Sequence, residues 1–281
     1  MRRAIRDFLS SPLGVIGLVI VFVVIIAGVF CEQLAPHDPY EVDLSLKFLP
    51  PSVKYPLGTD PMGRDMLSRV LYGIRISLTT GVTVLAIAVP IGVIVGAIAG
   101  YVNPAIDNLI MRVVDIFLAF PAYILAMAIG AALGASLMHA MLAVATVWWP
   151  SYARLVRGQV LSIKENTYVE AARAIGSGNG RILVRHILPN CLSPILVLIS
   201  MDVGVTILST AALSFIGLGA QPPTPELGSM IAQGRIHLID HWWITTAPGL
   251  TIFITALGLN LLGDNVRDFL DPQLRGTREL A

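Results

Sequence analysis

Two aspartates stand inside apolar runs of this sequence, where an ionisable side chain is costly and therefore informative. Asp202 lies about 16 Å into the run 191–216, and Asp115 about 9 Å into the run 109–133, at 1.5 Å per helical residue. Arg112 precedes Asp115 by one turn and is expected to pair with it, whereas the run that holds Asp202 has no Lys or Arg. Asp202 is therefore expected to face the interior of a bundle, a water-filled path or a partner subunit.

Motifs for enzymatic chemistry are weak or missing. The sequence has no HExxH or GxSxG motif, and its histidines show no metal-ligand spacing. The stretch 134–137 faintly resembles an intramembrane serine protease loop, but Ser136 falls at a turn near the outer surface. There is no GxxxxGK[ST] phosphate loop, and none of the three lysines follows a glycine. We therefore expect no catalysis, no cofactor, no metal and no ATP hydrolysis by the chain itself.

Composition indicates the elements that position these groups. Of the 281 residues, 55% are hydrophobic and 13% charged, against about 25% charged in soluble domains, and the mean hydropathy is +0.76. A helix that spans the bilayer needs about 20 mostly apolar residues. We predict an all-α membrane protein in one domain, with six transmembrane helices in the runs 13–31, 77–101, 109–133, 137–156, 191–216 and 245–263. A net charge of +1 argues against nucleic acid as a partner.

The distribution of Lys and Arg predicts the orientation. Of the 19 basic residues, six fall in the loops that are outside if the N-terminus is inside, and the rest fall inside. Both termini are therefore expected to face the cytoplasm. The predicted organisation is a cytoplasmic segment (1–12), a first span (13–31), an extracytoplasmic loop (32–76), a transmembrane core (77–266) with an inner loop (158–190) and an outer loop (217–244), and a cytoplasmic tail (267–281).

The polar segment 165–190 lies between two apolar runs and carries local signals of structure. Thr167 and Glu170 fit a capping box that begins a short helix, and Gly176 suits the position just past its end. A second short helix is expected from Gly180, ending at Pro189, with one face made of Ile182, Leu183, His186 and Ile187. Either a helix that docks another protein or an amphipathic helix that rests on lipid fits this pattern.

A family resemblance decides between these two alternatives. Glu170, Ala171, Ala172, Gly176, Leu188 and Pro189 follow the spacing of the EAA loop of ABC importer permeases, with His186 where an aliphatic residue is usual. In that family this loop couples the permease to a cytoplasmic ATPase subunit. The resemblance implies a type I importer bundle in a bacterial inner membrane.

Two further stretches resemble one branch of that family, the permeases for dipeptides, oligopeptides, glutathione and nickel. They are the GTDPMGRD stretch at 58–65, followed by Ser68-Arg69, and the SFIGLG stretch at 214–219. The ending GDNVRD with LDP, at 263–272, is also similar to this branch. The implied partners are a second homologous permease, two cytoplasmic ATP-binding subunits, an extracytoplasmic solute-binding protein and the lipid bilayer. The implied solute is a peptide, with nickel or another small solute as the alternative.

A stand-alone secondary transporter is the hypothesis of another class. Such carriers often contain inverted repeats and broken helices, and no convincing repeat is present in this sequence. Nor would such a carrier need a docking loop. Within the importer interpretation, Asp202 and Asp115 are the candidates for the translocation path.

Local patterns also predict contacts outside the EAA-like loop. Asp60 is expected to cap a helix with Pro61 at its first position, and Asp65 to pair with Arg69 one turn later. Small residues four apart, Gly92, Gly96 and Gly100, are expected to allow close packing of helices, by default within this subunit. Prolines inside two of the predicted spans, Pro90 and Pro121, are expected to kink their helices or to free backbone carbonyls.

Overall fold

The computed structural model describes residues 11–270, and the predictions for residues 1–10 and 271–281 lie outside that range. All helical segments within it are α2 (Pro12–Val29), α3 (Cys31–Leu34), η1 (Leu44–Leu46), α4 (Met66–Tyr101), α5 (Pro104–Ala119), α6 (Ala122–Leu133), α7 (Leu137–Ile163), α8 (Thr167–Ala174), α9 (Asn179–Ile182), η2 (Leu183–Ile187), α10 (Leu188–Ile216), α11 (Leu227–Gly234), η3 (Arg235–His237) and α12 (Trp243–Leu270). No strand forms among residues 11–270, and the predicted all-α class is confirmed.

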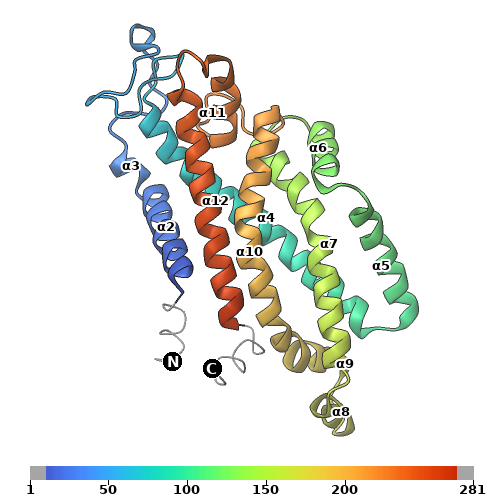
Figure 1. Ribbon diagram of the computed structural model, residues 1–281. Helices are drawn as coiled ribbons and strands as arrows, with labels where there is room; N and C mark the ends of the chain where they lie inside the picture. The colour runs from blue at the N-terminus through green and yellow to red at the C-terminus, as the bar shows by residue number, and fades with distance from the viewer. Residues whose placement is uncertain (1–10, 271–281) are drawn as a thin grey trace.

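The long helices form one bundle with two structurally different ends. Helix α4 packs against α7 and α10, α10 packs against α12, and α12 packs against α2 (Figure 1). One end carries α3, α11 and the 35–65 loop, and we call it the α11 end. The other carries α8 and α9, and we call it the α8 end. The first described turn of α2 and the last of α12 point toward the α8 end (Figure 1).

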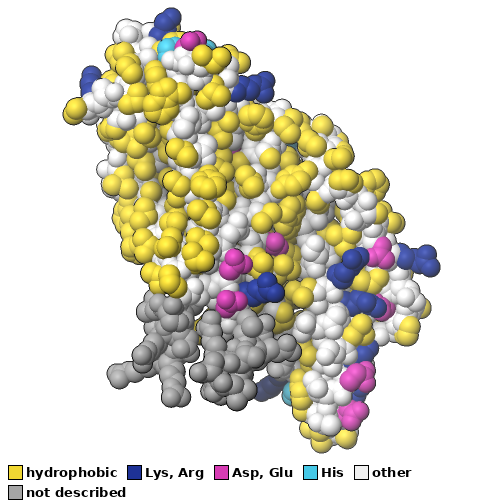
Figure 2. All heavy atoms as spheres, in the orientation of Figure 1, with side chains coloured by type: hydrophobic (Ala, Val, Ile, Leu, Met, Phe, Trp, Pro, Cys, Tyr) yellow, Lys and Arg dark blue, Asp and Glu magenta, His cyan; other side chains and the backbone are white. Residues whose placement is uncertain are grey.

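The surface of the bundle suits a lipid environment. In the range 11–270, four segments are long and apolar enough to cross a membrane: Pro12–Val29, Met66–Tyr101, Asn179–Ile216 and Trp243–Phe269. Hydrophobic side chains cover most of the middle of the face in Figure 2, and charged side chains gather toward its top and its lower part. The predicted fourth span corresponds to α7, whose polar and aromatic run from Trp148 to Arg157 lowers its hydropathy. The prediction of six spans is therefore not confirmed by length and composition.

The predicted third span is broken at Pro121. Helices α5 and α6 pass as a span only when taken together, and they meet at a bend of 92°. A residue before proline is disfavoured in the helical conformation, and Phe120 is extended with φ −88° and ψ 143°. Pro121 itself has no N–H to donate to the preceding turn. The expected effect of this proline is confirmed, whereas α4 continues as one helix through Pro90.

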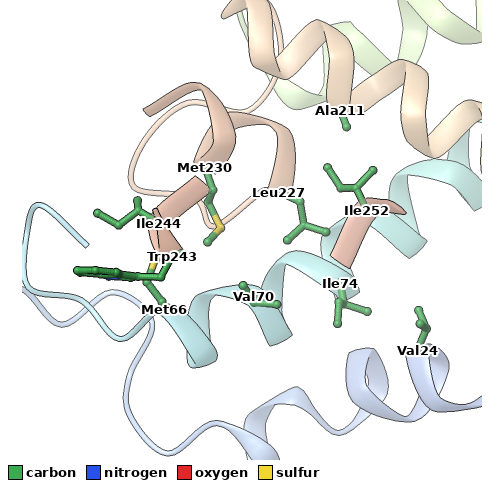
Figure 3. Close-up of a cluster of buried hydrophobic side chains, with 10 residues drawn as sticks. All are labelled: Val24, Met66, Val70, Ile74, Ala211, Leu227, Met230, Trp243, Ile244 and Ile252. Atoms are coloured by element: carbon green, nitrogen blue, oxygen red, sulfur yellow. The ribbon is translucent and has the colours of Figure 1, made fainter. Parts of the chain in front are cut away.

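Helix α4 is longer than the membrane core and reaches into the α11 end. Its 36 residues extend about 54 Å, against about 30 Å of hydrocarbon. Its first turns bury Met66, Val70 and Ile74 against Leu227 and Met230 of α11. Figure 3 shows these side chains converging with those of α2, α10 and α12, so five helices share one apolar cluster.

The glycine stripe of α4 faces α7 of the same chain, as predicted. A Cβ on Gly96 would collide with the backbone of Ala153, and one on Gly100 would lie 2.9 Å from the Arg157 carbonyl oxygen. A Cβ on Gly92 would collide with the Cβ of Tyr152. These glycines therefore let α4 and α7 approach backbone to backbone, and this contact fixes the position of Tyr152.

Candidate functional site

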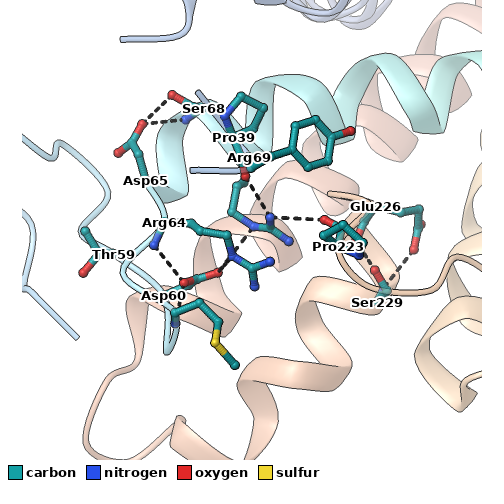
Figure 4. Close-up of polar contacts among 12 residues, drawn as sticks. Pro39, Thr59, Asp60, Arg64, Asp65, Ser68, Arg69, Pro223, Glu226 and Ser229 are labelled. Carbon is teal, nitrogen blue, oxygen red and sulfur yellow. Dashed lines mark hydrogen bonds and ion pairs between the residues drawn. The ribbon is translucent and has the colours of Figure 1, made fainter. Parts of the chain in front are cut away.

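Asp60 is the centre of a buried polar network at the α11 end (Figure 4). Its Oδ1 accepts the backbone N–H groups of Met62 (2.8 Å) and Arg64 (3.0 Å). Its Oδ2 accepts the Arg64 Nε–H at 2.6 Å and lies 3.5 Å from the Arg69 Nε. Asp60 is 3% exposed and Arg69 1%, so removing the Asp60 carboxylate would leave Arg69 buried without its anionic partner.

The predicted roles of Asp60 and Asp65 are wrong in one respect each. Asp65, not Asp60, caps a helix: its Oδ2 accepts the Ser68 N–H (2.8 Å) and the Ser68 hydroxyl (2.6 Å) at the start of α4. Arg69 pairs with Asp60 rather than with Asp65, whose Oδ2 binds Ser68. The Arg69 Nη1 also donates to the carbonyl oxygens of Pro39 (3.0 Å) and Pro223 (3.4 Å). This one side chain therefore joins two loops to α4.

Glu226 extends the buried polar region to α11. Its carboxylate accepts the N–H groups of Gly228 (3.0 Å) and Ser229 (2.8 Å) and so caps the helix. Burial raises the pKa of the Glu226 carboxyl, and the hydrogen bonds offset part of that rise. All of these contacts are structural, since each charged group serves another protein group.

Asp202 of α10 accepts a hydrogen bond from the neighbouring helix α7. The Tyr152 hydroxyl donates to its Oδ2 at 2.8 Å, and Tyr152 is fully buried. Trp148 lies one turn earlier on the same face of α7 and also hydrogen-bonds this carboxylate. Asp202 is near the middle of α10 and is itself partly exposed. Of the surroundings expected for Asp202, a facing helix of the same chain supplies its hydrogen-bond partners, and these are neutral side chains.

Two Arg–Asp pairs join α5 to α7. The Arg154 Nη2 lies 2.5 Å from the Asp115 Oδ1, and Arg157 holds Asp107 through two hydrogen bonds of 2.5 and 2.7 Å. The prediction that Arg112 pairs with Asp115 is therefore wrong. The partner is Arg154 on the facing helix α7, and residue spacing along one helix cannot predict a contact between two helices. The side chains of Arg154 and Asp115 are 56% and 64% exposed in the single chain, so this pair needs water or another protein chain beside it.

The segment 164–187 at the α8 end is anchored by a few buried side chains and is otherwise exposed. Val169 and Ala172 of α8 and Ile182 and Ile187 pack into a core shared with α7 and α10. The Tyr101 hydroxyl, at the end of α4, donates to the Asn179 Oδ1 at 3.1 Å. The remaining surface of α8 carries Ile175, which is 83% exposed.

Helix α8 begins one residue earlier than predicted. Asn166 is the N-cap and Thr167 the first helical residue, and no side-chain hydrogen bond caps this helix. The expected capping box of Thr167 and Glu170 is therefore wrong, and Glu170 is exposed. Gly176 has φ +84°, as expected of a residue that ends a helix in the left-handed region, and a Cβ there would meet nothing within 4 Å.

Pro189 does not end the second helix. Helix α9 continues through the π-helical turn η2 into α10, and Pro189 lies in the first turn of α10. Proline lacks the N–H that an α-helix needs at this position, and the wider π turn accommodates that gap. The second helix and the following span are thus joined by helical residues alone, with no loop between them.

The predicted loop residues all lie at the α8 end of the bundle, but they differ in exposure to solvent. Glu170, Ala171, Gly176 and Pro189 are exposed, His186 and Leu188 are partly exposed, and Ala172 is buried. The His186 carbonyl oxygen accepts a hydrogen bond from the Asn190 amide at 2.7 Å. Sequence reasoning missed Tyr152, Trp148 and Arg154 as partners of the intramembrane aspartates. One sequence pattern could have identified these partners: Trp148 and Tyr152, four residues apart and followed by arginines, stand in an otherwise apolar run.

These features define a polytopic helical membrane protein with a compact polar end and an exposed helical loop at the other. Residues 92–276 match the family described as binding-protein-dependent transport system inner membrane component, and residues 1–51 match the N-terminal transmembrane domain of oligopeptide transport permease C. The chain is 46% identical to a probable D,D-dipeptide transport system permease of Escherichia coli K12, over 95% of this chain and 90% of that one. It is 42% identical to a dipeptide permease of Alkalihalophilus pseudofirmus, over 98% and 90% of the two chains.

A third relative is a glutathione transport system permease of Escherichia coli O6, 42% identical over 96% of this chain and 90% of that one. In fold, the structure is similar to the inward-facing MetNI methionine ABC transporter, with a TM-score of 0.54 at 18% identity, covering 72% of this chain and 93% of that one.

The chain therefore belongs to the family of binding-protein-dependent transport system inner membrane components. It is a non-catalytic permease subunit of an ABC importer, and it resides in a bacterial inner membrane as a multi-pass protein. ATP hydrolysis belongs to separate ATP-binding subunits, and delivery of the solute belongs to a binding protein. A stand-alone carrier and an enzyme are thereby excluded.

Proposed function

We propose that this permease carries peptides across the inner membrane. Relatives more than 40% identical over most of their length are permeases for dipeptides and for glutathione, itself a tripeptide, which supports a short peptide as the solute. The assembled importer would contain this chain, a second homologous permease, two ATP-binding subunits and an extracytoplasmic binding protein. A deletion strain grown on defined dipeptides, glutathione or limiting nickel tests the solute: rescue by this chain for nickel alone would contradict a peptide.

In this importer, the segment 165–190 couples ATP binding to movement of the spans. The observation that supports this role is the division of α8 into an anchored face and an exposed face. Val169 and Ala172 hold it to the bundle, while Glu170, Ala171 and Ile175 remain free to contact another protein. The unbroken helical run from α9 through η2 into α10 connects this surface to the middle of the longest apolar segment of the α8 end.

Crosslinking in the assembled transporter tests the docking role. Cysteine at Ala171 should crosslink to a cysteine scan of the groove on the ATP-binding subunit, with a yield that changes when ATP is bound. Cysteine at Asn103 is the matched control, because this exposed residue lies in the α4–α5 turn and outside the proposed surface. No crosslink from Ala171 in any nucleotide state would contradict docking and would favour a helix that rests on lipid.

Asp202, and with it Asp115, is proposed to line the translocation path. Asp202 is partly exposed near the middle of α10 and has no basic partner among residues 11–270, so its carboxylate needs water or solute beside it. The exposed Asp115–Arg154 pair would continue this hydrated surface along α5 and α7. Asp202→Asn should lower peptide uptake while the complex still assembles. Unchanged uptake with unchanged ATPase stimulation would make Asp202 a tolerated structural group.

A further inference from the structure

Helix α8 is attached at both of its ends to the bundle, by side chains that lead to two different long helices. In its first turn, the Tyr168 hydroxyl accepts a hydrogen bond from the Asn190 Nδ2 of α10 at 3.2 Å. At its last turn, the Arg173 guanidinium lies 6.0 Å from the centre of the Tyr101 ring, at the end of α4. The first attachment leads to the helix that follows the segment in the chain, whereas the second leads to a helix that is distant in the sequence.

Tyr101 contacts both of the helices that flank the Gly176 turn. Its ring lies beside Arg173 of α8, and its hydroxyl donates to the Oδ1 of Asn179, the first residue of α9, at 3.1 Å. The Tyr101 side chain also packs against the apolar core into which α8 and α9 place their buried residues. One side chain of α4 therefore reaches across the turn from one arm to the other.

A second contact ties the same end of α4 to the start of the segment. Lys164 follows the last residue of α7, and its Nζ donates to the Gly100 carbonyl oxygen at 3.2 Å. The last carbonyl groups of an α-helix have no partner within the helix, and a cation close to them is favourable. The end of α4 is thus held on both sides of α8, by Lys164 before it and by Asn179 after it.

The Gly176 turn itself supplies little to fix its two arms. A Cβ on Gly176, Gly178 or Gly180 would meet nothing within 4 Å, so no neighbouring atoms pack against the turn at these positions. Glycine also permits more backbone conformations than other residues. The relative orientation of α8 and α9 therefore depends on the side chains that bridge them, and Tyr101 is one that comes from outside the segment.

We propose that Tyr101 is a positioning residue for coupling, which braces α8 and α9 against the end of α4. When an ATP-binding subunit displaces α8, α4 then moves with it, in addition to α10. This inference rests on the coupling role proposed above for the segment 165–190. Helix α4 also reaches the apolar cluster of the α11 end through Met66, Val70 and Ile74. The brace therefore gives the segment a connection to the opposite end of the bundle.

A distance measurement in the complete transporter tests the brace without reference to the solute. Spin labels are placed on Ala174→Cys of α8 and Val102→Cys after α4, both exposed, with partner subunits that lack cysteine. The native Cys31 and Cys191 are fully buried and are not labelled. The distance between the labels should be narrowly distributed and unchanged by ATP in the parent, and broad in Tyr101→Ala. A parent distance that shifts with ATP, or a Tyr101→Ala distribution as narrow as that of the parent, would overturn the proposal.

Uptake of L-alanyl-L-alanine and ATP hydrolysis, measured together in proteoliposomes with the binding protein, test the role in coupling. Peptides moved per ATP hydrolysed should fall at least about twofold in Tyr101→Ala. Tyr101→Phe, which keeps the ring and loses the hydrogen bond to Asn179, should lose less, and Val102→Ala should equal the parent. Uptake and hydrolysis that fall in proportion in Tyr101→Ala would assign Tyr101 to folding alone and overturn the proposal. Absence of uptake by the parent would contradict the proposed peptide solute, and the spin-label distances would then decide on the brace.

Discussion

At the α11 end, one cluster of charged side chains is buried and internally bonded, whereas the charged side chains of α8 are exposed. Asp60 and Arg69 are each at most 3% exposed and hold two loops against α4. Glu170 and Arg173 lie on the surface of α8, and no ion pair within residues 11–270 includes either of them. The same residue types therefore serve internal structure at one end and are available for partners at the other.

Glycines with positive φ show the same contrast. Gly63 has φ +76°, and a Cβ on it would collide with the Asp43 carbonyl oxygen, so both conformation and space require glycine there. Gly176 has φ +84° but open space around it, so only conformation requires glycine. A network fixed by packing resists local opening, whereas a loop with few buried contacts opens at low free energy. We infer that the α11 end is a rigid platform and that the α8 end is the responsive part of the subunit.

The largest loss of folding stability is expected from Arg69→Ala at the α11 end. The substitution leaves Asp60 buried without its second cation and frees both loops from α4. Arg64 still neutralises Asp60, so the loss comes mainly from the two hydrogen bonds of the charged Arg69 donor, each worth about 1.5–3 kcal/mol. The thermal midpoint of the purified protein should fall strongly, whereas Lys54→Ala, in an exposed loop nearby, should leave it unchanged. Equal midpoints for the two variants would remove the distinction between the ends.

Substitutions in the contact between α4 and α7 should cause the next largest loss of folding stability. Gly96→Val places side-chain atoms against the backbone of Ala153, and overpacking of this kind typically costs about 1–3 kcal/mol. Gly158→Val is the matched control, since Gly158 is an exposed helical glycine on α7 with nothing within 4 Å of its Cβ position. Thermal midpoints of both variants measure the difference. A loss in Gly158→Val equal to that in Gly96→Val would mean that the stripe is not a packing contact.

At the α8 end, Gly176→Val should disturb coupling with little effect on overall stability. A β-branched residue in the left-handed region costs roughly 1–2 kcal/mol, but no neighbouring atom is displaced. Gly176→Asn is the control, because asparagine tolerates this conformation. Peptide uptake should be lost in the valine variant and largely kept in the asparagine variant, with similar thermal midpoints. If both variants transport normally, the conformation of this turn does not matter for coupling.

The smallest effect on stability is expected from Tyr152→Phe. It removes the hydrogen bond to Asp202, worth about 1 kcal/mol, and leaves the packing of the ring unchanged. Uptake should fall in Tyr152→Phe and in Asp202→Ala, and the double variant should fall no further than Asp202→Ala alone, because both changes remove the same hydrogen bond. Tyr40→Phe, in the exposed loop at the α11 end, should transport normally. Additive losses would show that the two residues act separately.

Local signals in the sequence predicted local structure well. The short helix at α8, its end at Gly176 and the break at Pro121 all follow from backbone preferences of single residues, and the structure confirms them. The glycine stripe of α4 was also interpreted correctly, because a spacing of four places small residues on one helical face.

Contacts between distant segments could not be predicted in the same way. Arg69 and Asp115 each had an oppositely charged residue at helical spacing, yet each pairs elsewhere: Arg69 with Asp60, and Asp115 with Arg154 of another helix. Helical spacing shows which residues can meet along one helix, whereas the packing of α5 on α7 decides which do. The continuation of α9 into α10 was missed because Pro189 lies in the first turn of α10, where proline is tolerated, directly after a π-helical turn.

Amide hydrogen exchange in the complete transporter tests the contrast between the two ends most directly. We predict that amides in the first turns of α4, residues 66–74, are protected equally with and without ATP, because the buried network holds them in both states. Amides of α8, residues 167–176, should exchange faster without ATP and gain protection when ATP closes the partner subunits on this surface. Unchanged exchange in α8, or a change confined to the first turns of α4, would contradict the assignment of the α8 end as the responsive part of the subunit.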